Sequence, residues 1–129
     1  MSQILEALKK EGLTLENFSS ITEQQIAGWT QVSAHGTGAR IPPVDEMVTE
    51  MKVVSPEQGA MRLSKGDALF PWLRVALGSL AVVEEMTLKV RKSYRLHEKT
   101  FCCSYKELER EHKKLLQTHR HVRRTELMT

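Results

Sequence analysis

The sequence has few of the side chains from which reactive and structural centres are usually built. Its 129 residues include two cysteines, two tryptophans, two tyrosines and three phenylalanines. The cysteines are neighbours, Cys102 and Cys103, and adjacent cysteines are poorly placed to bridge one another within ordinary disulfide geometry. We expect both to be free thiols, which weakly favours a reducing compartment.

Several sequence patterns are also missing. No apolar run approaches the roughly 18 residues of a membrane span, and the N-terminus lacks the basic and apolar segments of a secretory signal. The sequence contains no Gly-x-Ser-x-Gly, no Cys-x-x-Cys and no Gly-Lys-Ser/Thr of a Walker loop. These absences disfavour a hydrolase or a metalloenzyme whose chemistry is carried by this chain alone.

Composition indicates one globular domain with little excess charge. Hydrophobic residues make up 40% of the chain and charged residues 27%, which is ordinary for a globular protein. Nineteen basic and sixteen acidic residues give a formal net charge of +3. This surplus is too small to indicate a nucleic-acid partner by itself, although most of it lies in the last third.

The patterning predicts an α+β fold, in which a mainly antiparallel sheet is flanked by helices. Strands are expected over residues 13–15, 47–54, 60–63 and 82–90, the middle two forming an antiparallel hairpin. Helices are expected over residues 3–10, from about 23 to 28, over 68–77, and from 105 to about 121. Capping boxes, formed by Thr22 with Gln25 and by Ser104 with Glu107, mark the second and fourth helix starts.

Four side chains in the second half could belong to the core, the surface or a reactive site. Phe70 and Trp72 are expected in the core, because large aromatic side chains dominate core packing. Glu84 and Glu85 are neighbours on a predicted strand and therefore point to opposite faces, so they cannot act as one acid/base pair. We expect both to be solvated or to form surface salt bridges.

The most distinctive stretch is Gln-Val-Ser-Ala-His-Gly-Thr-Gly-Ala at residues 31–39. Gly36 and Gly38 allow positive φ and a close approach to the main chain, while Ser33, Thr37 and successive N–H groups supply donors. Such a segment can form a backbone nest for a phosphate or pyrophosphate. As a bare pattern it is more often just a tight turn.

Neighbouring segments add specificity to that stretch. They are LTLENF at 13–18, EQQIAG at 23–28, AHGTGARIPP at 34–43 and LGSLAVV at 77–83. Together they resemble the FAD-binding domain of vanillyl-alcohol-oxidase-type flavoproteins, in particular the aldonolactone oxidoreductases and among them the galactonolactone dehydrogenases. The resemblance runs in one order from about residue 4 to residue 122.

The resemblance implies FAD as the cofactor and divides the chain into two parts. Residues 1–95 would be the C-terminal part of a PCMH-type FAD-binding domain, and residues 96–129 the start of the substrate domain. The residues implied to line the pyrophosphate are Ser20, Gln25 and Gly28. Those implied to run along the ribityl and phosphate portion are Val32, Ser33, Ala34 and His35. Gly36, Thr37 and Gly38 would keep the backbone accessible, and the main chain of Val82 would contact the adenine.

The resemblance also implies an activity. It is the oxidation of an aldono-1,4-lactone, such as L-galactono-1,4-lactone in ascorbate synthesis, with electrons passing through the flavin to cytochrome c or oxygen at the mitochondrial inner membrane. In that family the catalytic groups lie in the substrate domain and another flavin-binding loop lies upstream. We therefore assign no catalytic residue and no metal ligand to this chain, and expect it to supply FAD contacts only.

Three residues, Trp29, Ser79 and Ala81, depart from the family's pattern, and the first and last of them add bulk. Trp29 and Ala81 stand where the family usually has glycine. If the glycine backbone conformation is retained, we expect each substitution to cost about 1 kcal/mol.

A second hypothesis concerns the C-terminal residues. A non-catalytic interaction module could use a basic helix to bind an anionic partner, through Lys113, Lys114, Arg120, Arg123 and Arg124. No aromatic residues are interleaved with these cations, so no nucleic-acid partner is expected. The histidines at 112, 119 and 121 do not share one helix face, so no metal site is expected either.

Overall fold

The computed structural model describes residues 1–17, 21–36, 38, 40–97 and 102–118. The chain forms two compact units. One comprises residues 1–36 and 42–94, and the other comprises residues 37–41 and 95–129. The first unit contains both described sheets and is built from two small hydrophobic clusters.

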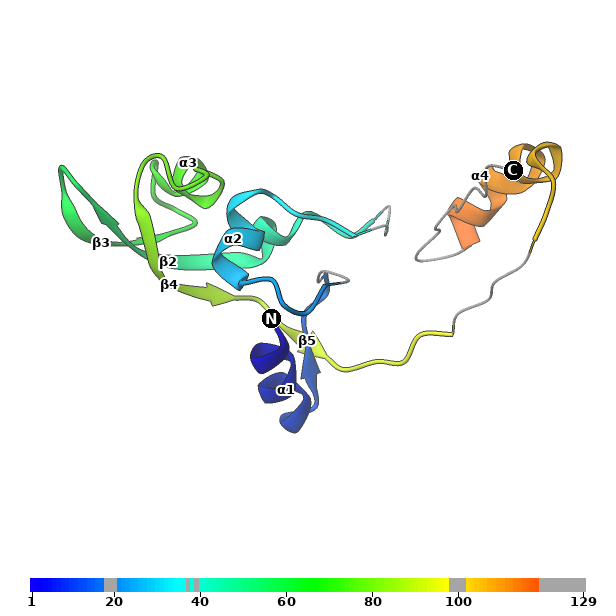
Figure 1. Ribbon diagram of the computed structural model, residues 1–129, viewed down its shortest axis with the longest axis horizontal. Coiled ribbons are helices and arrows are strands. Elements are labelled where there is room, and N and C mark those ends of the chain that lie inside the picture. Colours follow the sequence, from blue (N-terminus) through cyan, green and yellow to red (C-terminus); the bar gives the residue numbers. More distant parts are fainter. Residues whose placement is uncertain (18–20, 37, 39, 98–101, 119–129) are drawn as a thin grey trace. The chain divides into compact units, whose positions relative to one another are not determined.

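A three-stranded antiparallel sheet is the centre of the first unit (Figure 1). Its strands are β2 (Val48–Ser55), β3 (Gly59–Ser64) and β4 (Val82–Leu88), in the order β3-β2-β4. β2 and β3 form a hairpin in which Ser55 is paired with Gly59. Gly59 has φ +70°, a conformation that glycine adopts without steric cost, which explains its place at the end of the turn.

One hydrophobic cluster packs on this sheet. Val48, Met51 and Val53 point from β2 toward Phe70 and Leu73 of the short helix α3 (Phe70–Arg74), and Ala81 completes the cluster. Phe70 and the three β2 side chains are almost fully buried. Burying a side chain of this size stabilises the fold by about 1.5–3 kcal/mol, so these contacts hold α3 against the strands.

A second cluster holds the N-terminal segments. Helix α1 (Ser2–Lys10) lies beside the two-stranded sheet of β1 (Leu13–Thr14) and β5 (Arg91–Lys92) (Figure 1). Buried Leu15 and Trp29 pack with Val44 and Met47 of the 3-10 helix η1 (Val44–Met47). Trp29 belongs to helix α2 (Ile26–Gln31), which is thereby anchored to this cluster.

The described part of the second unit is mainly helix α4 (Tyr105–Thr118). The Ser104 backbone N–H donates to Glu107 Oε2 at 2.8 Å, and the Glu107 backbone N–H donates to the Ser104 hydroxyl at 3.3 Å. This reciprocal pair is the predicted capping box. It fixes the start of α4.

The structure confirms the α+β class, the antiparallel hairpin and the surface position of both strand glutamates. Glu84 pairs with Lys52 at 2.9 Å, and Glu85 pairs with Arg62 at 3.3 Å. Cys102 and Cys103 are free and exposed, as expected.

Two local predictions are wrong. Thr22 and Gln25 form no capping box, because α2 begins only at Ile26, Gln25 caps it without a side-chain bond, and Thr22 Oγ1 donates to the neighbouring Glu23. Trp72 is 69% exposed, since the short helix α3 turns Phe70 toward the sheet and leaves Trp72 on the outer side.

The helix predicted over 68–77 is shorter than expected, because α3 ends at Arg74 and a tight turn follows it at residues 76–79. Leu77 and Gly78 both have left-handed backbones, with φ +54° and +72°. The Ser79 N–H donates to the Ala76 carbonyl at 2.9 Å and closes the turn. Consecutive positive φ values are typical of a type I′ turn, whose first central position favours Asn over a residue such as Leu.

Replacing Leu77 should therefore stabilise the first unit. Leu77→Asn should raise the free energy of unfolding by about 1 kcal/mol, because Asn tolerates the left-handed conformation and the exposed leucine loses little packing. Urea denaturation measures this difference. Leu80→Asn, at an exposed position with an ordinary backbone, is the control and should change stability by less than about 0.5 kcal/mol.

The capping box makes the start of α4 sensitive to acid. Hydrogen bonds from the hydroxyl and the N–H of Ser104 hold the pKa of the Glu107 carboxyl below its ordinary value. The stabilisation from this cap is present above the ordinary pKa and should be lost as the pH falls through the lowered one. NMR titration should show the lowered pKa, and Ser104→Ala should return it toward the ordinary value. An unchanged pKa in Ser104→Ala would contradict the cap.

Candidate functional site

The glycine-rich stretch begins as the chain leaves α2. Ser33 has φ +52°, a left-handed conformation uncommon for a residue with a Cβ. Its N–H donates to the Thr30 carbonyl at 3.0 Å, and the Ala34 N–H donates to the Trp29 carbonyl at 3.3 Å. The Val44 N–H donates to the Ala34 carbonyl at 2.9 Å. The chain at 33–34 is therefore bonded to the end of α2 on one side and to the start of η1 on the other.

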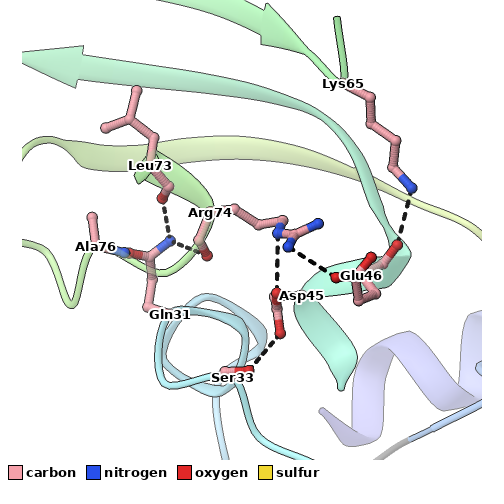
Figure 2. Close-up of polar contacts among 8 residues, drawn as sticks. All are labelled: Gln31, Ser33, Asp45, Glu46, Lys65, Leu73, Arg74 and Ala76. Atoms are coloured by element: carbon pink, nitrogen blue, oxygen red, sulfur yellow. Dashed lines mark hydrogen bonds and ion pairs between the residues drawn. The ribbon is translucent and has the colours of Figure 1, made fainter. Parts of the chain in front are cut away.

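A buried carboxylate lies directly against this turn (Figure 2). The Ser33 hydroxyl donates to Asp45 Oδ1 at 2.8 Å. Arg74 Nε lies 3.0 Å from Asp45 Oδ2, in an ion pair that lacks hydrogen-bond geometry. The Asp45 side chain is only 4% exposed, so the guanidinium offsets the cost of burying its charge.

The same arginine has a second acidic partner nearer the surface. Arg74 Nη2 donates to Glu46 Oε1 at 3.0 Å, and Lys65 Nζ donates to the Glu46 carbonyl at 3.1 Å (Figure 2). Arg74 thus connects the end of α3 to both acidic residues of η1.

The Gln31 side chain joins α2 to the end of α3. Its Nε2 donates to the carbonyls of Leu73 and Arg74 at 3.0 and 3.2 Å, and its Oε1 accepts from the Ala76 N–H at 3.1 Å (Figure 2). The amide is buried and has both its nitrogen and its oxygen bonded. It holds the last residue of α2 in place and so sets where the glycine-rich stretch begins.

Gly36 passes close to the loop that follows β1. A Cβ built on Gly36 would lie 2.8 Å from Asn17 Oδ1. Asn17 is buried, and its Nδ2 donates to the Pro42 carbonyl at 3.1 Å. Glycine is needed here for the close approach of two segments.

Strand β4 meets α2 at Met86. Thr30 Oγ1 donates to the Ile26 and Ala27 carbonyls at 3.0 and 2.9 Å and lies 3.8 Å from Met86 Sδ. Val82 lies at the other end of the strand, is paired with Val54, and is 69% exposed. Within the described residues no hydrogen bond joins Val82 to the glycine-rich stretch.

The other residues implied to contact a cofactor occupy different environments. Gln25 is exposed at the start of α2, Gly28 lies inside α2 with open space around it, and Val32 is exposed. Ala34 packs against the second hydrophobic cluster. His35 is exposed, and its Nδ1 lies 3.0 Å from the Gly36 carbonyl. Gly38 belongs to the second unit, and Ser20 and Thr37 lie outside the described residues.

The backbone conformations correct two expectations. Gly36 does not use the positive φ that glycine allows, and in this stretch Ser33 takes the left-handed conformation instead. Trp29 and Ala81 have ordinary φ values and are buried in the two clusters, so the expected cost of replacing glycine does not arise.

The polar residues that shape the turn were not identified from sequence. Gln31 and Asn17 lie in or beside the motifs, but nothing in their spacing shows that their side chains are buried. Asp45 and Arg74 are 29 positions apart, and no local pattern pairs them.

An anionic group could use only part of this main chain. The N–H groups of Ser33 and Ala34 and the Ser33 hydroxyl are bonded within the protein. The N–H groups of His35 and Gly36 donate to no acceptor in the part of the chain that the structure describes. Among the described residues 33–36, these two adjacent donors are the ones that fit an external phosphate.

The described residues provide neither a metal site nor a membrane-spanning helix. Residues 1–17, 21–36, 38, 40–97 and 102–118 contain no group of three or more side chains able to hold a metal ion. No helix among them is both long and apolar enough to cross a membrane.

Comparison with curated proteins places the chain beside lactone dehydrogenases. It is 48% identical to "L-galactono-1,4-lactone dehydrogenase, mitochondrial" of Brassica oleracea and of Arabidopsis thaliana, over 125 residues that make up 95% of this chain and 21% and 20% of those proteins. It is 32% identical to the L-gulono-1,4-lactone dehydrogenase of Mycobacterium tuberculosis, over 70% of this chain and 21% of that protein. The chain spans about a fifth of the length of these relatives. No protein-family model matches it.

Solved structures share the fold. A solvent-stable cholesterol oxidase superposes with a TM-score of 0.64 and 19% identity, over 71% of this chain and 20% of that one. An alkyldihydroxyacetonephosphate synthase superposes with a TM-score of 0.61 and 20% identity, over 70% and 19%. The antiparallel α+β arrangement thus recurs inside larger proteins.

Substitutions should show that Gly36 is required for packing and that Gly28 is not. Gly36→Ala should destabilise the first unit by about 1–3 kcal/mol, because the new methyl must displace a buried asparagine. Gly28→Ala, at a helical position with open space, should stabilise it by about 1 kcal/mol. Chemical denaturation measures both. Adding Asn17→Ala to Gly36→Ala should remove the clash, so the two substitutions together should cost less than the sum of each alone.

Proposed function

Since the chain is homologous over 95% of its length to one segment of the L-galactono-1,4-lactone dehydrogenases, we propose that it forms part of the FAD site of an aldonolactone oxidoreductase. The single observation that carries this proposal is the 48% identity over 125 residues. The shared fold with two larger proteins supports the same placement.

The chain's own contribution would be to hold the cofactor. FAD, when bound, supplies the hydride acceptor of the reaction. The N–H groups of His35 and Gly36, which are unbonded within the described residues, would donate to its diphosphate. The exposed side chain of Gln25 and the backbone at Gly28 and Val32 would line the same group. Ser33 and Ala34 would act indirectly, by directing the chain into that segment. Ser20, Thr37, Gly38 and the Val82 main chain remain proposed contacts.

The proposed division of the chain follows from the same homology. Residues 1–95 would complete the FAD-binding domain, and residues 96–129 would begin the substrate domain. The first compact unit ends its last segment at Tyr94, which supports a boundary at this point.

The proposed whole-protein activity is the oxidation of an aldono-1,4-lactone, of the L-galactono-1,4-lactone type used in ascorbate synthesis, with cytochrome c or oxygen as electron acceptor. The names of the plant relatives support a mitochondrial location. The chain spans about a fifth of those relatives, and we have assigned it no catalytic residue. We therefore propose that the 129 residues alone bind FAD without oxidising lactone.

No observation favours the basic-helix hypothesis. Over its described length α4 carries the cations Lys106, Arg110, Lys113 and Lys114 and the anions Glu107, Glu109 and Glu111. These charges nearly balance. The arginines at 120, 123 and 124, on which that hypothesis mainly depends, lie outside the described residues.

Titration with FAD tests the proposed function. Adding the 129-residue chain to FAD should raise the fluorescence anisotropy of the flavin in a saturable way, and ADP should compete because it carries the same diphosphate. Riboflavin, which has no phosphate, is the control and should bind more weakly. An anisotropy that stays at the value of free FAD would contradict the proposal. Retention on anionic lipid that is lost in salt would then favour the interaction module.

A further inference from the structure

A chain of polar contacts runs from Arg74 through Asp45 to Ser33, just before the segment proposed to meet FAD. The contacts are 3.0 Å from Arg74 Nε to Asp45 Oδ2 and 2.8 Å from the Ser33 hydroxyl to Asp45 Oδ1. All three residues belong to the first compact unit. Figure 2 shows the carboxylate lying between the serine and the guanidinium.

Ser33 has a backbone conformation that is unfavourable for a residue with a Cβ. A left-handed φ of +52° brings the Cβ of an L-residue close to its carbonyl oxygen, so such a residue needs outside support. The hydrogen bond to the buried carboxylate supplies it, because a bond to a charged acceptor is stronger than one between neutral groups. Asp45 thereby fixes the point at which the chain changes direction after α2.

The direction of this turn determines where the next donors point. Ala34 follows Ser33 directly, and its carbonyl accepts from the Val44 N–H at 2.9 Å, next to Asp45 in sequence. Two contacts to neighbouring residues of η1 therefore hold the turn. The N–H groups of His35 and Gly36, which have no acceptor among the described residues, come immediately afterwards, so their orientation depends on this turn.

Arg74 has an electrostatic role as well as a geometric one. An unpaired carboxylate beneath the turn would disfavour an anionic ligand on the following residues. The guanidinium, whose side chain is only 20% exposed, neutralises Asp45 from the side opposite Ser33. It also binds Glu46, so it limits the negative charge of both acidic residues in η1.

We propose that Asp45 and Arg74 are positioning residues for the FAD diphosphate: Asp45 holds the left-handed turn at Ser33, and Arg74 holds and neutralises Asp45. This inference rests on the proposed function. It adds two residues that contact no cofactor themselves and that neither the glycine-rich motif nor the family resemblance includes.

The experiment compares variants of the full 129-residue chain. Ser33→Ala and Asp45→Ala each remove the Ser33–Asp45 hydrogen bond, whereas Ser33→Thr keeps a hydroxyl and should restore most of the affinity. Glu84→Ala is the control, because it removes a carboxylate from an exposed ion pair on β4. Three quantities are measured: FAD affinity by flavin anisotropy, hydrogen exchange of the Ala34 and Val44 amides, and the folded fraction by circular dichroism.

Ser33→Ala and Asp45→Ala should weaken FAD binding about tenfold or more in fully folded protein, as expected for loss of a charge-assisted bond that orients the donors. The same variants should speed exchange at the Ala34 and Val44 amides, and Arg74→Gln should also weaken FAD binding. Glu84→Ala should match the wild type in both measurements.

Two results would overturn the inference. One is unchanged FAD affinity in folded Ser33→Ala and Asp45→Ala. It would show that the contacts among Ser33, Asp45 and Arg74 serve only the stability of the fold. The other is unchanged exchange at both amides, which would show that Asp45 does not hold the turn. A wild-type chain that binds no FAD would instead overturn the proposed function and the cofactor half of this inference together. The exchange measurement would still decide whether Asp45 shapes the turn.

Discussion

The first unit depends on one buried amide. Gln31 makes three hydrogen bonds to the main chain around the end of α3, at residues separated from it by more than forty positions. A buried amide left without partners is costly, so α2 and α3 are held at one fixed separation. Trp29, two residues earlier, packs in the other hydrophobic cluster. Helix α2, though only six residues long, therefore links both clusters. The turn that follows α2 starts from a helix whose position is fixed by both.

In this structure Ser33 rather than Gly36 gives the glycine-rich motif its left-handed backbone. A phosphate cradle is usually explained by glycines with positive φ, yet here the left-handed residue is Ser33, and Gly36 serves a close approach to Asn17. The departures from the family at Trp29 and Ala81 likewise fill hydrophobic clusters at ordinary φ. Two of the side chains that shape the turn, Asp45 and Arg74, thus come from η1 and α3, outside the motif.

Sequence reasoning succeeded where the signal was local. The β2–β3 hairpin, the cap at Ser104 and the surface glutamates each depend on residues a few positions apart, and all are confirmed. It failed at Trp72 and at the Thr22 cap, because packing against the sheet decides which aromatic is buried and where α2 begins. The Asp45–Arg74 pair joins residues 29 positions apart, so only the folded chain brings it together. The proposed cofactor contacts were assigned by resemblance, and they remain predictions.

The segment from α3 to β4 leaves much apolar surface in contact with water. Trp72 and Val82 are each 69% exposed and Leu77 is 71% exposed, while Leu69 and Leu80 also face outward. Exposed apolar side chains favour association between molecules where they gather into one patch. A formal net charge of only +3 gives little electrostatic repulsion between molecules. We therefore expect the solubility of the purified chain to depend more on these apolar side chains than on its net charge.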